Sequence, residues 1–181
     1  MDKVWTLTLD TATPYLSLGL FRGEAGLGRV VRVERRHEEV LFKLLEEVLR
    51  EVGARREAIS TLVLGEGPGS YTGLRIALAA GLGLAQALGA RVYGMSSLLA
   101  AAWPFLEEGK SLTPLFTARN RLYYGATYVL EGGRPREAFP PRKVRAEELP
   151  REGLLLDAPP DPRALYELLP FAHEGVEPLY L

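Results

Sequence analysis

Cysteine is absent from this 181-residue sequence, and histidine is nearly so, with only His37 and His173. Without cysteine the chain can form neither disulfides nor thiolate metal sites, so a reducing cytoplasm is the expected location. Ser70 also lacks a recognisable histidine base, and its glycine neighbours do not have the Gly-x-Ser-x-Gly spacing of a nucleophile elbow. A peptidase is therefore not expected.

An excess of charge and a membrane-spanning run are missing as well. The sequence has 22 Lys and Arg against 23 Asp and Glu, a net charge of −1, so any contact with RNA must be local or belong to a partner. The longest apolar stretch, residues 76–90, is interrupted by Gln86 and three glycines and is too short to cross a bilayer. The first residues also lack the pattern of a signal peptide, which agrees with a cytoplasmic location and no membrane contact.

What is present predicts an α/β protein. Turn clusters and hydrophobic periodicity predict an antiparallel meander of three strands, followed by alternating helices and strands. The expected strands are residues 4–9, 16–21, 28–34, 62–65 and 91–95, and the expected helices are residues 37–52, 72–88 and 96–103. A change in composition near residues 104–111 marks a boundary. We expect a first lobe at residues 1–105 and a smaller second lobe at residues 106–181.

The second lobe starts a new pattern. Its expected strands are residues 112–118, 123–130, 134–139 and 154–156, followed by a short helix at residues 163–168. Gly132 and Gly133 form the expected hairpin turn.

A glycine-rich segment, residues 65–75, is the most informative part of the chain. Gly65, Gly67, Gly69 and Gly73 lie between a short apolar strand and a long apolar helix. A loop of this kind exposes backbone N–H groups before a helix, where they can hold a phosphate. It also lets another stretch of backbone come close. The sequence leaves both uses open.

Asp10 ends the first strand, where an acidic residue can coordinate Mg²⁺ and phosphate, or can simply accept hydrogen bonds within a turn. The candidate contacts for a nucleotide or phosphate are Asp10, Thr11, Gly67, Gly69, Ser70 and Thr72. One hypothesis is therefore an independent nucleotide-binding phosphotransferase or ATPase. ATP turnover by the isolated chain, abolished by Asp10→Ala, distinguishes it from a binding subunit.

The order of elements resembles one lobe of the actin-like fold of sugar kinases and chaperone ATPases. Four motifs point to a more specific family within this fold. In chain order they are Leu-Asp-Thr-Ala-Thr at 9–13, the glycine segment at 65–75, Ala-Arg-Asn-Arg-Leu-Tyr-Tyr at 118–124 and Val-Glu-Pro-Leu-Tyr-Leu at 176–181. Together they resemble the bacterial TsaB (YeaZ) family. The second lobe is short for this family.

The resemblance implies a subunit that works with TsaD, which transfers a threonylcarbamoyl group to an adenosine beside the tRNA anticodon. TsaD holds a metal through two histidines one helical turn apart, and the matching positions here are Ser97 and Ala101. Neither side chain replaces imidazole as a ligand of a transition metal. The resemblance therefore implies no metal site and no catalytic residue in this chain.

The resemblance also implies where partners bind. In the family the first two helices pair with those of TsaD, or of a second TsaB copy as a homodimer. Ala77, Gly81 and Ala85 lie four residues apart and leave one helix face nearly bare, which favours close helix packing. The expected interface residues are Leu41, Leu45, Arg75, Ala77, Leu78, Gly81 and Ala85. The resemblance also implies that a TsaE-type ATPase docks on the complex of this chain with TsaD. The chain is then expected to contact tRNA mainly through that complex, and ATP or ADP is expected at the interface within the complex.

Overall fold

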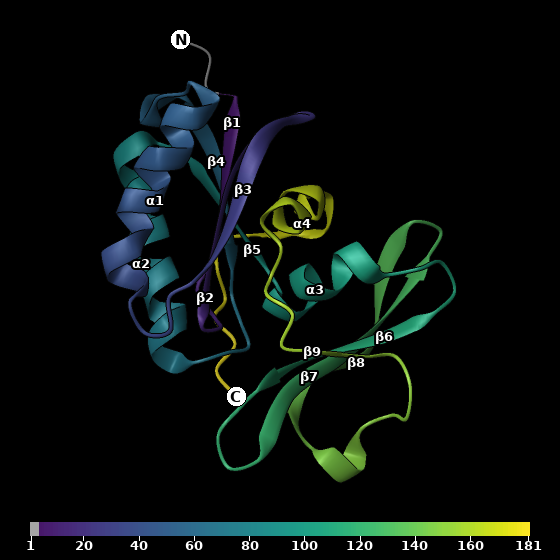
Figure 1. Cartoon of the computed structure of the whole chain (residues 1–181). Helices are drawn as coiled ribbons and strands as arrows, with labels where there is room; N and C mark the ends of the chain where they lie inside the picture. The colour runs from purple at the N-terminus through teal and green to yellow at the C-terminus, as the bar shows by residue number, and fades with distance from the viewer. Residues whose placement is uncertain (1–3) are drawn as a thin grey trace.

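The structure is a computed structural model that describes residues 4–181, and in these residues two β-sheets enclose a layer of helices (Figure 1). The larger sheet has the order β10-β5-β4-β1-β2-β3 and the smaller one the order β8-β7-β6-β9. The strands of the larger sheet are β1 (Trp5–Asp10), β2 (Tyr15–Arg22), β3 (Ala25–Arg32), β4 (Ile59–Gly65), β5 (Arg91–Met95) and β10 (His173–Glu174). Those of the smaller sheet are β6 (Ser111–Thr117), β7 (Leu122–Glu131), β8 (Arg134–Arg145) and β9 (Leu154–Leu156).

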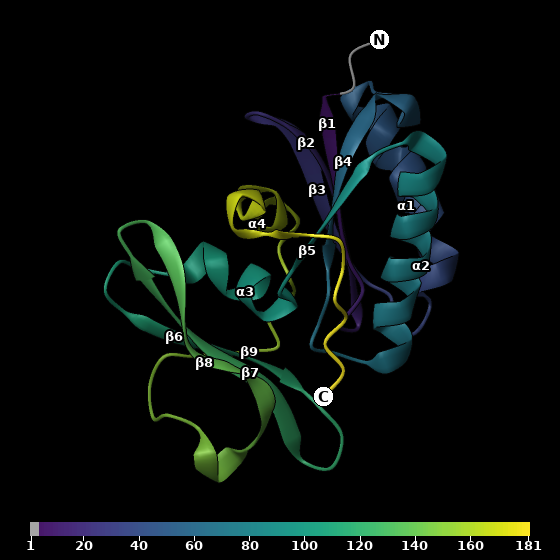
Figure 2. The same ribbon diagram turned by 180° about the vertical axis from the view of Figure 1, so that it is seen from behind.

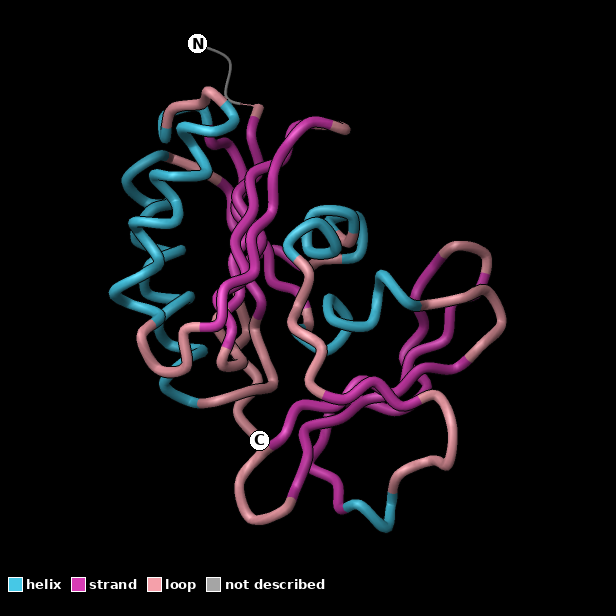
Figure 3. Tube along the Cα trace, viewed as in Figure 1, coloured by secondary structure: helices cyan, strands magenta, loops and turns pink. Residues whose placement is uncertain are grey.

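The helices lie on both faces of the larger sheet (Figure 3). They are α1 (His37–Val52), α2 (Tyr71–Leu88), α3 (Ser97–Ala102) and α4 (Pro162–Glu167), with 3-10 turns at Arg56–Ala58, Trp103–Phe105, Ala146–Glu148 and Leu169–Phe171. Among residues 4–181, no helix is long and apolar enough to span a membrane.

The larger sheet is built around β1. This strand pairs antiparallel with β2 and parallel with β4, and β4 pairs parallel with β5. All six residues of β1 are buried because helices cover both faces of the sheet. A three-strand meander followed by parallel strands and crossover helices confirms the predicted α/β, actin-like fold.

The helices α1 and α2 cover one face of this sheet (Figure 1). The apolar stripe of α1 is buried there, and Gly53, in the left-handed conformation, ends the helix. The core between these helices and the sheet includes Leu7, Leu20, Leu62 and Leu64. This face is therefore closed by the first two helices.

The opposite face carries α3 and α4, which lie between the two sheets (Figures 1 and 2). A second core forms there from Val63 of β4, Leu98 of α3, Phe116 of β6 and Leu165 of α4. Hydroxyl groups also join the layers, because the Thr8 Oγ1 hydroxyl donates a hydrogen bond of 2.9 Å to the carbonyl of Pro162.

The predicted boundary between the lobes is wrong for the last part of the chain. Residues 160–181 do not extend the second sheet but return to the first lobe, beginning where the Ser17 hydroxyl donates a hydrogen bond to the Pro160 carbonyl. There α4 packs against β1 and β2, and β10 pairs with β5. Two further corrections are smaller: β8 continues to Arg145 rather than ending near residue 139, and β10 was not predicted. The proline-rich C-terminal part of the chain has no alternating hydrophobic pattern, so the sequence gives no sign that β10 pairs at the edge of the larger sheet.

Candidate functional site: the glycine loop and the exposed face of α2

The glycine loop joins β4 to α2 and lies against the turn after β1. Its glycines are required by close packing, since a Cβ atom at Gly65 would overlap the Asp10 carboxylate. A Cβ at Gly69 would overlap the Ala12 carbonyl, and one at Gly73 would overlap the Thr11 carbonyl. Of the two uses that the sequence left open, the close approach of backbone is the one that the structure shows.

Asp10 is buried under this loop, with 1% of its surface exposed. Its Oδ2 accepts a hydrogen bond of 2.6 Å from the Ser97 hydroxyl, and its Oδ1 accepts one of 2.8 Å from the Ala12 N–H. Burial raises the pKa of Asp10 from 3.8 to about 6, and these hydrogen bonds oppose the rise. The carboxylate is thus fully engaged inside the chain.

Thr11 and Ser70, two of the other predicted phosphate contacts, also have polar groups that bind within the protein. The Thr11 hydroxyl bonds to the Gly73 carbonyl and accepts from the Ala77 N–H. The Ser70 hydroxyl caps α2 by accepting from the Gly73 N–H at 3.0 Å, and the Ser70 N–H donates to the Ala12 carbonyl.

The remaining three contacts differ in exposure. The Gly67 N–H donates a hydrogen bond of 3.0 Å to the Ser97 hydroxyl, and Gly69 is buried. Thr72 and Ser70 are the exposed members of the predicted set. The loop therefore offers only its outer edge to a ligand.

Ser97 has a structural role that the sequence did not predict. Its hydroxyl connects Asp10 at the end of β1 with Gly67 in the glycine loop. Ala101, one helical turn later, is 1% exposed in the second core. Within residues 4–181, no group of three or more His, Asp or Glu side chains is placed to hold a metal ion.

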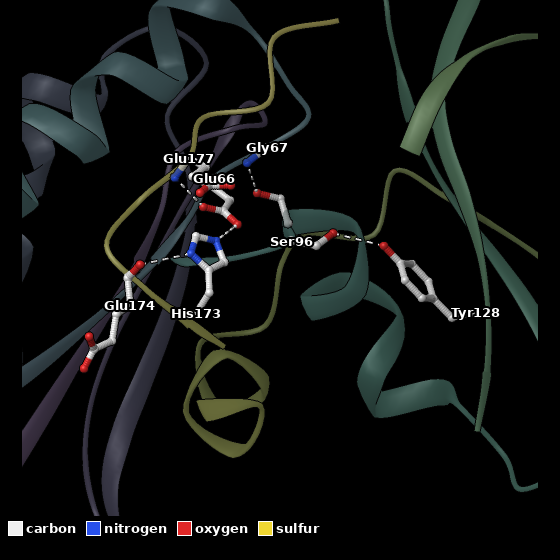
Figure 4. Close-up of polar contacts among 8 residues, drawn as sticks. Glu66, Gly67, Ser96, Tyr128, His173, Glu174 and Glu177 are labelled. Carbon is white, nitrogen blue, oxygen red and sulfur yellow. Dashed lines mark hydrogen bonds and ion pairs between the residues drawn. The ribbon is translucent and has the colours of Figure 1, made fainter. Parts of the chain in front are cut away.

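A second unpredicted contact joins Glu66 to His173 (Figure 4). The Glu66 carboxylate lies 2.6 Å from His173 Nε2, and this hydrogen bond is the main reason that the pKa of His173 is raised. Beside the pair is a cavity of about 250 Å³, which is also lined by Ser96, Tyr128 and Glu137. The two partners are 107 residues apart, so no local pattern links them.

Six of the seven predicted interface residues are not on the surface. They are buried in the core of the first lobe, and they are Leu41, Leu45, Ala77, Leu78, Gly81 and Ala85. Gly81 shows the reason, because a Cβ there would overlap the Leu64 side chain of β4. The bare face of α2 serves packing on its own sheet, so the prediction is wrong for these six residues. Only Arg75 is exposed.

The exposed face of α2 is a different set of residues. Positions 71, 75, 79, 82 and 86 are exposed at spacings of three and four, which places them in one stripe along the helix. They are Tyr71, Arg75, Ala79, Leu82 and Gln86, and we call them the α2 stripe. Tyr71 is 59% exposed and Leu82 47%. Arg75 is the one charged residue of this helix.

The exposed face of α1 contrasts with this stripe. It carries glutamates, Lys43 and Arg50, with Phe42 as its one large exposed apolar residue. Charged faces of this kind are ordinarily solvated, whereas a surface stripe with a single charge along an 18-residue helix is unusual. The α2 stripe is therefore the better candidate for a protein interface.

Known proteins resemble this chain in sequence. Residues 31–156 match the family model of TsaD, described as tRNA N6-adenosine threonylcarbamoyltransferase. The chain is 32% identical to an uncharacterized protein of Mycobacterium tuberculosis over 165 residues, which is 90% of this chain and 75% of that protein. It is 29% identical to the tRNA threonylcarbamoyladenosine biosynthesis protein TsaB of Haemophilus influenzae over 154 residues.

The match to the Haemophilus protein covers 82% of this chain but 65% of that protein, just under two thirds of its length. Among solved structures, YeaZ from Pseudomonas aeruginosa superposes with a TM-score of 0.85 at 24% identity. That match covers 98% of this chain and 100% of that one, and it shows a shared fold.

Proposed function

Because the chain belongs to the TsaB (YeaZ) proteins of the TsaD family, we propose that it is a non-catalytic subunit in the biosynthesis of threonylcarbamoyladenosine in tRNA. Its partner in this proposal is a TsaD-type catalytic subunit. The observation that carries the proposal is the exposed, largely apolar α2 stripe, with Arg75 as its only charge, beside the charged exposed face of α1.

The positions of Ser97 and Ala101 support a non-catalytic role. The Ser97 hydroxyl is committed to Asp10 and Gly67, and Ala101 has no ligand atom. Asp10 is likewise bonded within the chain rather than directed at solvent. These contacts also give no support to the alternative, an independent phosphotransferase that uses Asp10 to hold Mg²⁺.

The docking surface in this proposal is the α2 stripe, together with Phe42 of α1. A subunit of the same family has an equivalent helix, so two such helices can pack against each other. A homodimer would use the same surface and compete with the catalytic subunit. In this proposal a TsaE-type ATPase then binds the assembled complex, and the complex contacts tRNA. ATP or ADP binds near Ser70 and Thr72, where the two subunits meet.

A charge placed within the α2 stripe tests this surface. Leu82→Asp is expected to weaken binding of the TsaD-type subunit from the same organism at least tenfold, because a buried carboxylate would have no partner. Leu156→Asp is the matched control, since Leu156 is 57% exposed on β9 of the second sheet. The measurement is the dissociation constant by calorimetry, with thermal unfolding of each variant as a check of folding.

Reconstitution tests the function itself. Modification of tRNA by the TsaD-type subunit, the TsaE-type ATPase and the adenylate-forming enzyme is expected to require this chain and to be lost with Leu82→Asp. Full modification without the chain would overturn the proposed function. Equal binding by Leu82→Asp and Leu156→Asp would move the interface elsewhere.

A further inference from the structure

Residues 173–181, which we call the strap, lie across the glycine loop on the side where α2 begins (Figures 1 and 4). The strap begins with β10, which pairs with β5, and the Gly175 N–H donates to the Val92 carbonyl at 2.9 Å. Val176 then packs against the core of the first lobe. The strap is thus attached to the first sheet at its start and reaches toward α2.

Glu66 of the glycine loop holds the strap at three points. Its carboxylate accepts hydrogen bonds from the His173 ring at 2.6 Å and from the Glu177 N–H at 2.8 Å. Its carbonyl accepts a third bond of 2.8 Å from the Leu179 N–H. The carboxylate lies against Gly94 of β5, where a Cβ would overlap it, so its position is confined. The side chain of Glu66 is 13% exposed, which makes this the most buried ion pair of the chain's described residues.

The far end of the strap meets the α2 stripe. The rings of Tyr180 and Tyr71 lie 4.9 Å apart, and the Arg75 guanidinium lies 5.3 Å from the centre of the Tyr71 ring. Tyr180 is 46% exposed and Tyr71 59%. Two aromatic rings and an arginine, the residue types that dominate protein interfaces, therefore form one continuous exposed row.

We propose that the strap is part of the partner-binding surface, and that Glu66 and His173 are a positioning pair that holds Tyr180 against Tyr71 for contact with a TsaD-type subunit. This inference rests on the proposed function and extends it. The occupant is a TsaD-type subunit because the row of rings is continuous with the α2 stripe. A second copy of this chain is an alternative that the test distinguishes.

Protonation of His173 connects this surface to pH. The pKa of His173 is raised by the hydrogen bond to Glu66, with smaller contributions from the Glu174 carbonyl and from the charges of Glu66 and Glu177, while partial burial lowers it. A raised pKa means that the pair stabilises the strap fully below the ordinary pKa of histidine, and that this contribution is lost as pH rises through the folded value. The other titratable residues around His173 and its strand are Glu137, Tyr128, Tyr93 and Glu174.

Substitution of Tyr180 tests the contact. Tyr180→Ala is expected to weaken binding of the TsaD-type subunit about tenfold, whereas Tyr180→Phe keeps the ring and binds like the unsubstituted chain. Phe139→Ala is the matched control, because Phe139 is 53% exposed on the second sheet. Equal affinities for Tyr180→Ala and the control would overturn the inference.

The pH profile tests the positioning pair. Affinity for the subunit is expected to fall several-fold between about pH 6 and about pH 9. Glu66→Gln keeps an acceptor for the Glu177 N–H but removes the charge, so the affinity of this variant is expected to change little with pH. The matched control is Glu131→Gln, which removes the carboxylate of the exposed pair with Arg136 and is expected to keep the pH dependence of the unsubstituted chain. An unchanged profile in Glu66→Gln would refute the positioning role, even if Tyr180→Ala weakens binding.

The two failures can be told apart. If the unsubstituted chain does not bind the TsaD-type subunit, the proposed function fails together with this inference. If it binds and the strap variants bind equally well, only the inference fails. If the strap variants lose self-association, measured by light scattering, but still bind the TsaD-type subunit, the strap belongs to a homodimer interface and the proposed occupant is wrong.

Discussion

Asp10 illustrates how one residue can suggest chemistry in the sequence and serve structure in the fold. Its position after the first strand is where a phosphate-binding carboxylate would stand. In the structure its two oxygens bind Ser97 and Ala12, and Gly65 and Gly69 bring the loop down over it. Its raised pKa follows from this burial. The carboxyl therefore organises the junction between β1, the glycine loop and α3.

Burial of Asp10 predicts a specific effect of pH on stability. Since its pKa rises from 3.8 to about 6 on folding, the folded state binds the proton more tightly, and ionisation above that value destabilises the protein. Relative to Asp10→Asn, the unsubstituted chain is expected to gain about 2 kcal/mol of unfolding free energy between about pH 7 and about pH 4. Urea unfolding at both pH values measures this. A constant difference between the two proteins would contradict it.

At the scale of the element, α2 has two faces with opposite roles. Gly73 and Gly81 face inward, where their missing side chains admit the Thr11 carbonyl and the Leu64 side chain. Gly83 lies on the exposed side, with nothing within 4 Å of the place where its Cβ would be. A glycine in the same helix can thus be essential for packing or merely unfavourable for the helix.

This contrast predicts opposite effects of one substitution. Gly73→Ala is expected to lower the unfolding free energy by about 2 kcal/mol or more, because backbone of the turn after β1 would have to move. Gly83→Ala is expected to raise it by up to about 1 kcal/mol through helix propensity. Thermal and urea unfolding of both variants measure these changes. Destabilisation of similar size in both would mean that the close approach at Gly73 is not what requires glycine.

At the scale of the whole molecule, the last segment ties the two sheets together. Leu165 and Leu168, from α4 and the residue that follows it, are fully buried in the core between the sheets, and the Thr8 and Ser17 hydroxyls bond to the carbonyls of Pro162 and Pro160. The two predicted lobes therefore share the core between the two sheets.

A shared core predicts unfolding in one transition. Trp5 lies in the core of the first lobe and Trp103 packs against the core between the sheets, so Trp5→Phe and Trp103→Phe each leave one reporter. In both variants the fluorescence midpoint in urea is expected to equal the midpoint from circular dichroism. Leu165→Ala is expected to lower both midpoints, with a loss of about 2–5 kcal/mol. Separate transitions for the two tryptophans would show independent lobes.

Local patterns in the sequence were sufficient for the α/β class, for most strands and helices, and for the placement of the glycine loop before a helix. These features depend on residue type and spacing within one element, and the family motifs add to them. The resemblance to the family, not these patterns, implied that Ser97 and Ala101 stand at the positions where TsaD has its metal ligands. The same patterns assigned the inward face of α2 to an interface, because a stripe of small residues looks the same whether a sheet or a partner covers it.

Only the packed structure shows which face of α2 remains exposed, that residues 160–181 return to the first lobe, and that Glu66 contacts His173. Each of these depends on contacts between residues far apart in the chain, where the sequence carries no periodic signal. Burial and hydrogen bonding then decide which polar groups remain free for a ligand or a partner. For that reason the glycine loop, for which the sequence left both phosphate contact and close backbone packing open, is in the structure a site of backbone packing that also anchors the strap.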